Sequence, residues 1–150
     1  METREQTLTL AKTMLEEGDP NGALGVLEEY LRLYDGDSEA HALAGVAYGQ
    51  LGIYYLAARH LGHSLAVNDN QNNVRLMLLR ALIEMRRWDD ALPVAERLKR
   101  DNPNSSMIAT LYESVIENAQ LPETGWSRTK TRLDATITFA RDNNVFEDEG

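Results

Sequence analysis

Hydrophobic residues recur along the chain with the spacing of amphipathic helices, and short polar stretches interrupt them at regular intervals. Ala23, Leu27 and Leu31 lie four residues apart, which places their side chains on one face of a helix. The polar stretch Gly18-Asp19-Pro20 separates this run from an earlier apolar run of the same kind. The pattern therefore predicts two helices joined by a short turn.

The same pattern recurs at an offset of 34 residues. Alanine occupies equivalent positions at 23, 57 and 91, and polar stretches close the successive units at 35–38, 69–73 and 101–104. A repeat of this length is typical of helix pairs that stack on one another. Residues 4–37, 38–71 and 72–105 are therefore predicted to form one helix pair each, with the small alanine where the two helices of a pair cross closely.

This repeat resembles the tetratricopeptide repeat, whose unit carries Trp, Leu, Gly and Tyr in its first helix and Ala and Phe in its second. The second unit matches these places in order with His41, Ala44, Gly45, Tyr48, Ala57 and Leu61. The chain departs from the family pattern at Arg86, which stands where the other two units have a turn glycine. The resemblance implies an all-α fold, a right-handed α-solenoid of three helix pairs.

The C-terminal part of the chain is predicted to be a divergent helix pair or cap over residues 106–146. One helical run extends from Met107 to about Asn118, and a break follows at 121–125. A second helix then presents one face that contains Trp126, Lys130, Leu133, Ile137 and Ala140. Residues 147–150 are expected to be an acidic tail. We expect residues 1–150 to be a single domain of tetratricopeptide type, since a chain of this length can bury one substantial core.

In the resembled family the first helices of successive repeats line a concave groove that holds an extended peptide or a helix. By alignment, the lining of this chain is Leu8, Lys12, Leu15, Leu43, Val46, Gln50, Leu76, Met77, Arg80 and Ile83. The lining is mostly apolar, so we expect an apolar or amphipathic segment of a client protein, bound as by an adaptor or chaperone. Lys12 and Arg80 would meet acidic positions of the ligand. The alternative reading is that Leu43, Leu76 and Met77 are core residues between helices.

The turn of the second unit carries a second candidate surface. Ile53, Tyr55 and Leu56 occupy places that face water in the family. Large apolar groups exposed side by side usually mark a contact with another protein. We therefore keep homodimerisation or a wider self-assembly through this edge as the alternative function, and a covering loop or tail as the structural alternative.

Composition narrows the choice of partners. The net charge is −9, with 24 acidic and 15 basic residues, which disfavours a nucleic-acid partner because phosphate backbones are bound by clustered Lys and Arg. The third unit is an exception with seven basic and five acidic residues, consistent either with solvated helix faces or with an acidic partner segment. The apolar stretch 42–58 is too short and too rich in Gly and Tyr for a membrane span. The polar N-terminus lacks the apolar core of a secretory signal, so we expect a cytoplasmic protein.

Candidate catalytic and metal-binding residues are few. The chain has no cysteine, which excludes disulfides and thiolate metal sites. His60 and His63 are spaced for one face of a helix, but His41 belongs to the other helix, and two ligands do not make a metal site. Adjacent carboxylates such as Asp89 and Asp90 diverge on a helix and do not form an acid–base pair. We expect no enzyme activity, no cofactor and no metal.

Overall fold

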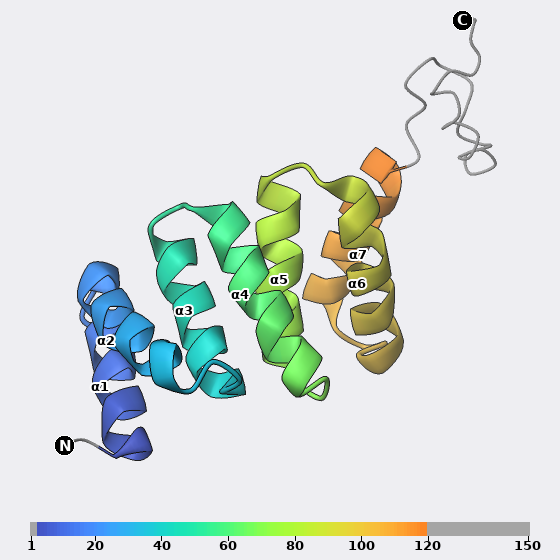
Figure 1. The fold of residues 1–150 in the computed structure, drawn as a ribbon. Coiled ribbons are helices and arrows are strands. Elements are labelled where there is room, and N and C mark those ends of the chain that lie inside the picture. Colours follow the sequence, from blue (N-terminus) through green and yellow to red (C-terminus); the bar gives the residue numbers. More distant parts are fainter. Residues whose placement is uncertain (1–2, 120–150) are drawn as a thin grey trace, which may run out of the picture. The chain divides into compact units, whose positions relative to one another are not determined.

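The computed structural model describes residues 3–119, and each regular element in that range is an α-helix (Figure 1). The helices are α1 Arg4–Glu16, α2 Pro20–Leu33, α3 Ser38–Gln50, α4 Tyr54–Val67, α5 Asn72–Glu84, α6 Trp88–Asp101 and α7 Ser106–Ala119. The predicted all-α class and the three helix pairs are confirmed, and so is the helical run from Met107 to Asn118. The predicted second helix of the cap and the acidic tail lie outside the described residues.

The turns inside the three helix pairs have one backbone geometry. In each turn an amide donates to the carbonyl oxygen five residues earlier, Asp19 to Met14, Ile53 to Tyr48 and Arg87 to Leu82, at 2.8–2.9 Å. The residue before each donor has a positive φ: 80° at Gly18, 76° at Gly52 and 57° at Arg86. This left-handed conformation ends a helix at low cost for glycine only. The departure from the repeat pattern at Arg86 is therefore a place of backbone strain.

Small residues allow the helices within a pair to approach closely. Ala23, Ala57 and Ala91 are at most 1% exposed, as expected for the repeated alanine. In the second pair Gly45 of α3 faces Leu61 of α4, and a Cβ atom at Gly45 would lie 2.6 Å from Leu61 Cγ. The crossing of α3 and α4 thus depends on the absence of a side chain at Gly45.

The chain divides into two compact units, residues up to Val94 and residues from Ala95 onward, and the boundary falls inside α6. In the first unit the helices pack in sequence order, α1 on α2, α2 on α3, α3 on α4 and α4 on α5. In the second unit Leu98 and Val115 are fully buried, and Lys99 Nζ lies 5.9 Å from the ring centre of Tyr112. None of the described helices combines the length and apolar character that a membrane span requires.

Candidate functional site

Two adjoining hollows lie along α3 and α5 in the first unit, and together they are called the groove below. The first hollow, of about 540 Å³, is lined by Arg4, Lys12, Ser38, Glu39, Ala42, Leu43, Val46, Asn68, Gln71, Asn73, Val74 and Met77. The second, of about 350 Å³, is lined by Gly45, Val46, Gly49, Gln50, Tyr54, Ala57, Leu61, Met77, Arg80, Ala81 and Glu84. Val46 and Met77 line both hollows, so these two residues form the middle of the groove.

Six of the ten residues expected to line a groove do so in the structure: Lys12, Leu43, Val46, Gln50, Met77 and Arg80. Leu76 and Ile83 are half-buried and line neither hollow. The inclusion of Leu8 and Leu15 was wrong, because these side chains are 2% and 7% exposed and belong to the core that α1 forms with α2 and α3.

The error at Leu8 and Leu15 is not one of register. The positions 34 residues later in α3 are Ala42 and Gly49, which are half-buried and line the groove. In α1 the same positions carry leucine side chains, which pack into the core with α2 and α3. The exposed stripe of α1 is Thr9, Lys12 and Glu16.

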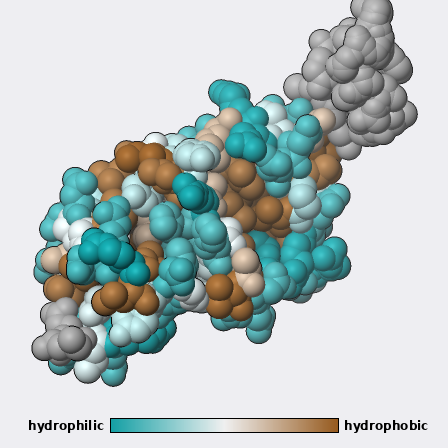
Figure 2. Space-filling view, viewed as in Figure 1, coloured by the Kyte–Doolittle hydropathy of each residue, from teal (hydrophilic) through white to brown (hydrophobic). Residues whose placement is uncertain are grey.

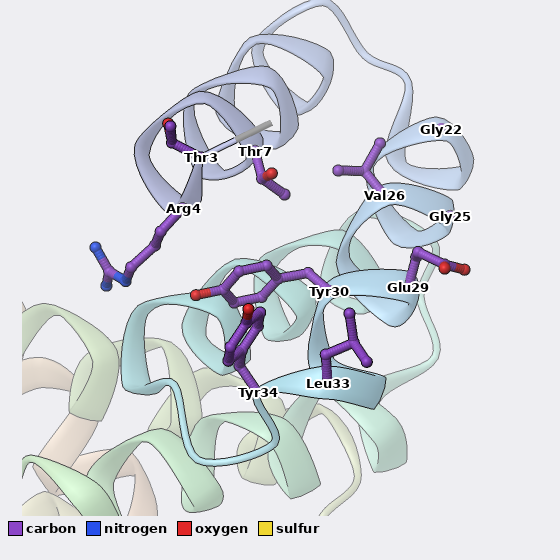
Figure 3. A pocket seen from close by; sticks show the side chains of 10 residues that line it. All are labelled: Thr3, Arg4, Thr7, Gly22, Gly25, Val26, Glu29, Tyr30, Leu33 and Tyr34. Atoms are coloured by element: carbon purple, nitrogen blue, oxygen red, sulfur yellow. The ribbon is translucent and has the colours of Figure 1, made fainter. Parts of the chain in front are cut away.

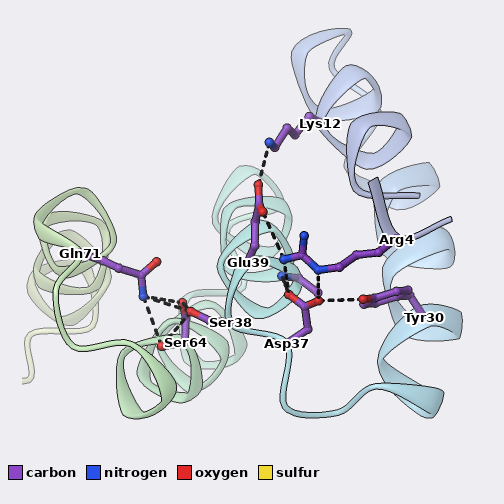
Figure 4. Close-up of polar contacts among 9 residues, drawn as sticks. Arg4, Lys12, Tyr30, Asp37, Ser38, Glu39, Ser64 and Gln71 are labelled. Carbon is purple, nitrogen blue, oxygen red and sulfur yellow. Dashed lines mark hydrogen bonds and ion pairs between the residues drawn. The ribbon is translucent and has the colours of Figure 1, made fainter. Parts of the chain in front are cut away.

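Polar residues form the rim of the first hollow, and sequence reasoning missed them. Gln71 Nε2 donates to Ser38 Oγ at 3.2 Å, and to the carbonyl oxygen and Oγ of Ser64 at 3.2 and 3.1 Å (Figure 4). These bonds fix the carboxamide of Gln71 between α3, α4 and α5. Asn73 is exposed on the first turn of α5 and also lines the hollow. The 34-residue offset could have identified Gln71 as a residue between helix pairs, because Gln71 is equivalent to Asp37, the N-cap of α3.

Asp37 joins the first helix pair to α3. Its carboxylate accepts hydrogen bonds from Arg4 Nε at 2.7 Å, from the Tyr30 hydroxyl at 2.7 Å and from the amide of Ala40 at 3.0 Å (Figure 4). Partial burial acts to raise the pKa of Asp37, but these hydrogen bonds outweigh it and lower the pKa to about 2. Asp37 is therefore ionised at neutral pH and holds α1, α2 and α3 together.

Lys12 meets a carboxylate of its own chain. Its Nζ lies 2.7 Å from Glu39 Oε2, and both side chains are roughly half exposed (Figure 4). The charge that sequence analysis assigned to ligand recognition is thus already partnered. The α1 side of the groove is therefore less cationic than the sequence suggested.

The apolar edge at the turn of the second helix pair, between α3 and α4, is only partly exposed. Ile53 and Tyr55 are 42% and 62% exposed, whereas Leu56 is half-buried. Hydrophobic patches alternate with hydrophilic ones on the face that Figure 2 shows, so the surface is not uniformly polar. Ile53 and Tyr55 remain accessible to a partner, and Leu56 contributes less.

Three histidines that the sequence distributes over two helices lie together. His41 Nε2 lies 2.7 Å from the carbonyl oxygen of Asp35 and must donate to it, since a carbonyl only accepts. Nδ1 of His41 lies 3.0 Å from Nδ1 of His60, so the two rings share a hydrogen bond. His63 stacks on His41 with ring centres 5.1 Å apart. Sequence analysis set His41 apart from the other two, and the structure corrects that separation.

The contacts of His60 favour its neutral form. Burial lowers the pKa of His60, and the neighbouring His41, His63 and Arg59 lower it further, to about 4. Over the residues that the structure describes, no group of three His, Asp or Glu side chains is arranged to hold a metal ion. The three histidines are packing residues.

Comparison with known proteins gives relatives in structure alone. No protein-family model matches the sequence, and no curated protein does. The second TPR domain of human RPAP3, solved in complex with the HSP70 peptide SGPTIEEVD, superimposes with a TM-score of 0.66 at 12% identity, over 73% of this chain and 91% of that one. MamA 41-end from Desulfovibrio magneticus RS-1 gives 0.72 at 21% identity, over 90% and 78%. YrrB, described as a TPR protein with an unusual peptide-binding site, gives 0.72 at 19% identity, over 82% and 63%.

Proposed function

We propose that this chain, whose fold is that of the tetratricopeptide repeat, is a protein-interaction module that binds an apolar or amphipathic segment of a client protein in the groove along α3 and α5. The observation that carries the proposal is that the apolar side chains of Val46 and Met77 line both hollows, with polar side chains beside them. Two proteins of the same fold, the RPAP3 domain and YrrB, are described with a bound peptide and a peptide-binding site, which supports this reading.

The floor and the rim supply different parts of the recognition. Leu43, Val46, Val74 and Met77 form an apolar floor that would bury apolar side chains of the ligand. Met77 is unbranched and adapts to side chains of irregular shape. The exposed carboxamide of Asn73 can both donate to and accept from the backbone of an extended peptide. A segment with alternating apolar side chains and an accessible backbone fits this arrangement.

The charges around the groove are of both signs. Lys12 is paired with Glu39 at the α1 end, and Arg80 and Glu84 line the second hollow at the other end. Under this proposal, recognition of the client segment depends on the apolar floor and on the polar rim. The module acts as an adaptor or chaperone in the cytoplasm under this proposal, and no catalytic step is assigned to it.

The test compares two matched substitutions. Val46→Arg puts a long charged side chain into the middle of the groove, whereas Val67→Arg makes the same change at a 57% exposed position of α4 outside the lining. Proteins captured by the wild-type chain are identified by mass spectrometry, and the segment that each contributes is titrated as a peptide by calorimetry. We expect at least a tenfold weaker Kd for Val46→Arg and an unchanged Kd for Val67→Arg. Equal Kd values for both variants would contradict binding in the groove.

Self-assembly through the apolar edge of the second helix pair is the second candidate function, and the exposure of Ile53 and Tyr55 favours it. Tyr55→Asp places a charge in the centre of that edge. If the edge mediates association, sedimentation equilibrium shows a mass that rises with concentration for the wild type and not for Tyr55→Asp. A wild-type chain that stays monomeric at high concentration removes this candidate.

A further inference from the structure

The second hollow of the groove has the size of a site for one side chain. Its lining comes from three helices, α3, α4 and α5. It measures about 350 Å³, near the lower end of the range of roughly 300–1,000 Å³ that small-molecule sites occupy. A hollow of this volume holds one large ring system and not a whole peptide segment. It is therefore suited to a single anchoring side chain.

The hollow exists because α3 carries a glycine where the helices beside it carry large side chains. Gly49 corresponds, at the 34-residue offset, to Leu15 of α1 and Ile83 of α5. A Cβ atom at Gly49 would have no atom within 4 Å, so no neighbouring side chain fills the space in front of it. At Gly45, by contrast, an added Cβ would meet Leu61, so that glycine serves the crossing of α3 and α4. The missing side chain at Gly49 thus leaves room in the groove.

The apolar part of the lining suits an aromatic ring. Val46 and Leu61 supply aliphatic side chains. Met77 supplies a thioether, and a sulfur atom at about 5 Å from an aromatic ring is a favourable contact. Tyr54 adds a half-buried ring, which can pack edge to face against a second ring. An aromatic side chain therefore gains contacts with Met77 and Tyr54 that an aliphatic one does not.

The polar part of the lining suits a ring that carries a hydrogen-bond donor. Gln50 Nε2 donates to the carbonyl oxygen of Leu15 at 3.3 Å, and Oε1 of the same carboxamide can accept. Glu84 adds a carboxylate, whose oxygens also accept. Arg80 lies one helical turn before Glu84, and a guanidinium can stack on the face of a ring while its N–H groups bond in their own plane. The lining thus combines acceptors with a cation for an electron-rich ring face.

Tryptophan is the side chain that meets all of these conditions. Its indole has the strongest cation–π face of the natural side chains, and its single N–H only donates. Phenylalanine lacks the donor, and the tyrosine hydroxyl both donates and accepts. Buried tryptophans are also among the side chains that carry most of the binding energy in protein interfaces.

A larger hollow between α1 and α2 is the competing place for an aromatic group. It measures about 960 Å³. Val26 points across it toward Thr7, and the rings of Tyr30 and Tyr34 lie against each other at one end, with centres 5.0 Å apart (Figure 3). At 960 Å³ against 350 Å³, it is too wide to contact one ring on all sides. Gly25 lines this hollow and not the groove, so it offers a matched control.

We infer that the second hollow is the anchor site of the client segment and takes one tryptophan side chain. The inference rests on the proposed function, because it assumes that the client binds in the groove. The indole lies against Met77 and on the guanidinium of Arg80, and its N–H donates to Gln50 or Glu84. Gly49 provides the room for the ring. The rest of the segment continues into the first hollow, so the specificity of the groove depends on this one side chain.

The probe for this site is 3-methylindole, which is the tryptophan side chain itself. Its binding to the full chain is followed by NMR on labelled methionine methyl groups, with the Met77 signal assigned from Met77→Leu. We expect a saturable shift of the Met77 signal with a millimolar Kd. Gly49→Leu fills the hollow and should weaken this Kd by about tenfold or more, and Gly49→Ala should give an intermediate value. Gly25→Leu, where an added Cβ also has no atom within 4 Å, should leave the Kd unchanged.

Three results would overturn the assignment. The first is the absence of a saturable shift of the Met77 signal. The second is an equal Kd for the wild type and Gly49→Leu, once circular dichroism has verified that the variant keeps its helix content. The third is a tighter Kd for 4-methylphenol or 3-methylbutan-1-ol, the soluble counterparts of the tyrosine and leucine side chains, than for 3-methylindole.

A phage library of random peptides separates this inference from client binding as such. Peptides selected on the wild-type chain should be lost on Val46→Arg and on Gly49→Leu, and should be kept on Gly25→Leu. They should share one tryptophan, and its replacement by alanine should weaken the Kd by about tenfold or more. Peptides that are lost on Val46→Arg and kept on Gly49→Leu leave the groove as the binding site and overturn the tryptophan anchor. Peptides that bind Val46→Arg as tightly as the wild type overturn the proposed function, and the anchor with it.

Discussion

The strained turn at Arg86 gives the sharpest test of how the repeat shapes this chain. Gly18, Gly52 and Arg86 are 34 residues apart, all have a positive φ, and the three turns share the same backbone hydrogen bonds. At the position of positive φ, Arg86 carries a Cβ atom, whereas the other two turns have glycine. For an L-residue the left-handed conformation costs roughly 1–2 kcal/mol.

Arg86→Gly should raise the free energy of unfolding. The substitution removes the strain, but glycine also gives the unfolded chain more freedom, which costs roughly 0.4–1 kcal/mol. The net gain is then roughly 0.5–1 kcal/mol, since the smaller cost offsets about half of the larger gain. We measure this gain by urea unfolding, monitored by far-ultraviolet circular dichroism, and expect a higher midpoint with an unchanged m-value.

Two control variants separate backbone strain from loss of the Arg86 side chain. Arg86→Ala keeps the Cβ atom and should leave the free energy of unfolding within about 0.5 kcal/mol of the wild type. Gly52→Ala introduces the strain in a turn where an added Cβ meets no atom within 4 Å, and it should cost about 1 kcal/mol. If Arg86→Ala stabilises as much as Arg86→Gly, the side chain and not the φ angle is responsible, and the reasoning fails.

Three other predictions address packing and pH. Gly45→Ala places a Cβ atom 2.6 Å from the buried Leu61 and should lower the free energy of unfolding by about 1–2 kcal/mol. Gly49→Ala adds a Cβ atom with nothing within 4 Å and should raise it by roughly 0.5–1 kcal/mol. Thermal melts should therefore show a lower melting temperature for the first variant and a higher one for the second. His60 has a folded-state pKa of about 4 against an ordinary 6.5, so its stabilising effect is complete above pH 6.5 and is lost as the pH falls toward 4. Because His60 is partly exposed, the loss in the free energy of unfolding is about 1–2 kcal/mol. His60→Gln should abolish this loss in urea midpoints measured from pH 6.5 to 4. A variant that keeps the wild-type pH dependence contradicts the assignment to His60. Asp37→Asn should lower the free energy of unfolding by about 1–2 kcal/mol at neutral pH. The difference from the wild type should shrink as the pH falls from 3.8 toward 2, because the wild-type carboxylate then becomes protonated. A constant difference would show that the ionised carboxylate does not stabilise the junction.

The sequence predicted the helix pairs well because their packing positions repeat. The alanines at 23, 57 and 91 and the turns at 18, 52 and 86 needed only the 34-residue offset to be found, and the same offset placed Val46 and Arg80 in the groove. The prediction failed at Leu8 and Leu15, although the equivalent residues of α3, Ala42 and Gly49, line the groove, because the leucine side chains of α1 pack into the core. The exposed stripe of α1 contains the polar residues Thr9 and Glu16, so hydrophobicity alone could not reveal which stripe of α1 faces outward.

Other features depended on side-chain geometry that no periodicity encodes. The three histidines meet because α3 and α4 cross closely at Gly45, a distance that the sequence does not state. Gln71 reaches back to Ser64 across a loop, and Lys12 is paired with Glu39 of the next helix pair. Each contact joins residues of different helices, so it follows from the packing of the pairs and not from the pattern within one helix.

The two junctions between successive helix pairs show how the repeat keeps its geometry while its chemistry changes. Arg4, Tyr30 and Asp37 form the first, and the positions 34 residues later, Ser38, Ser64 and Gln71, form the second. The first depends on an ionised carboxylate, and the second consists of neutral hydrogen bonds. Protonation of Asp37 therefore loosens α1–α2 from α3 without weakening the contacts of Gln71 beside the groove. The contact of His60 with His41 between α4 and α3 weakens earlier, as the pH falls from 6.5 toward 4, so acid should act first within the second helix pair and then on the junction at Asp37.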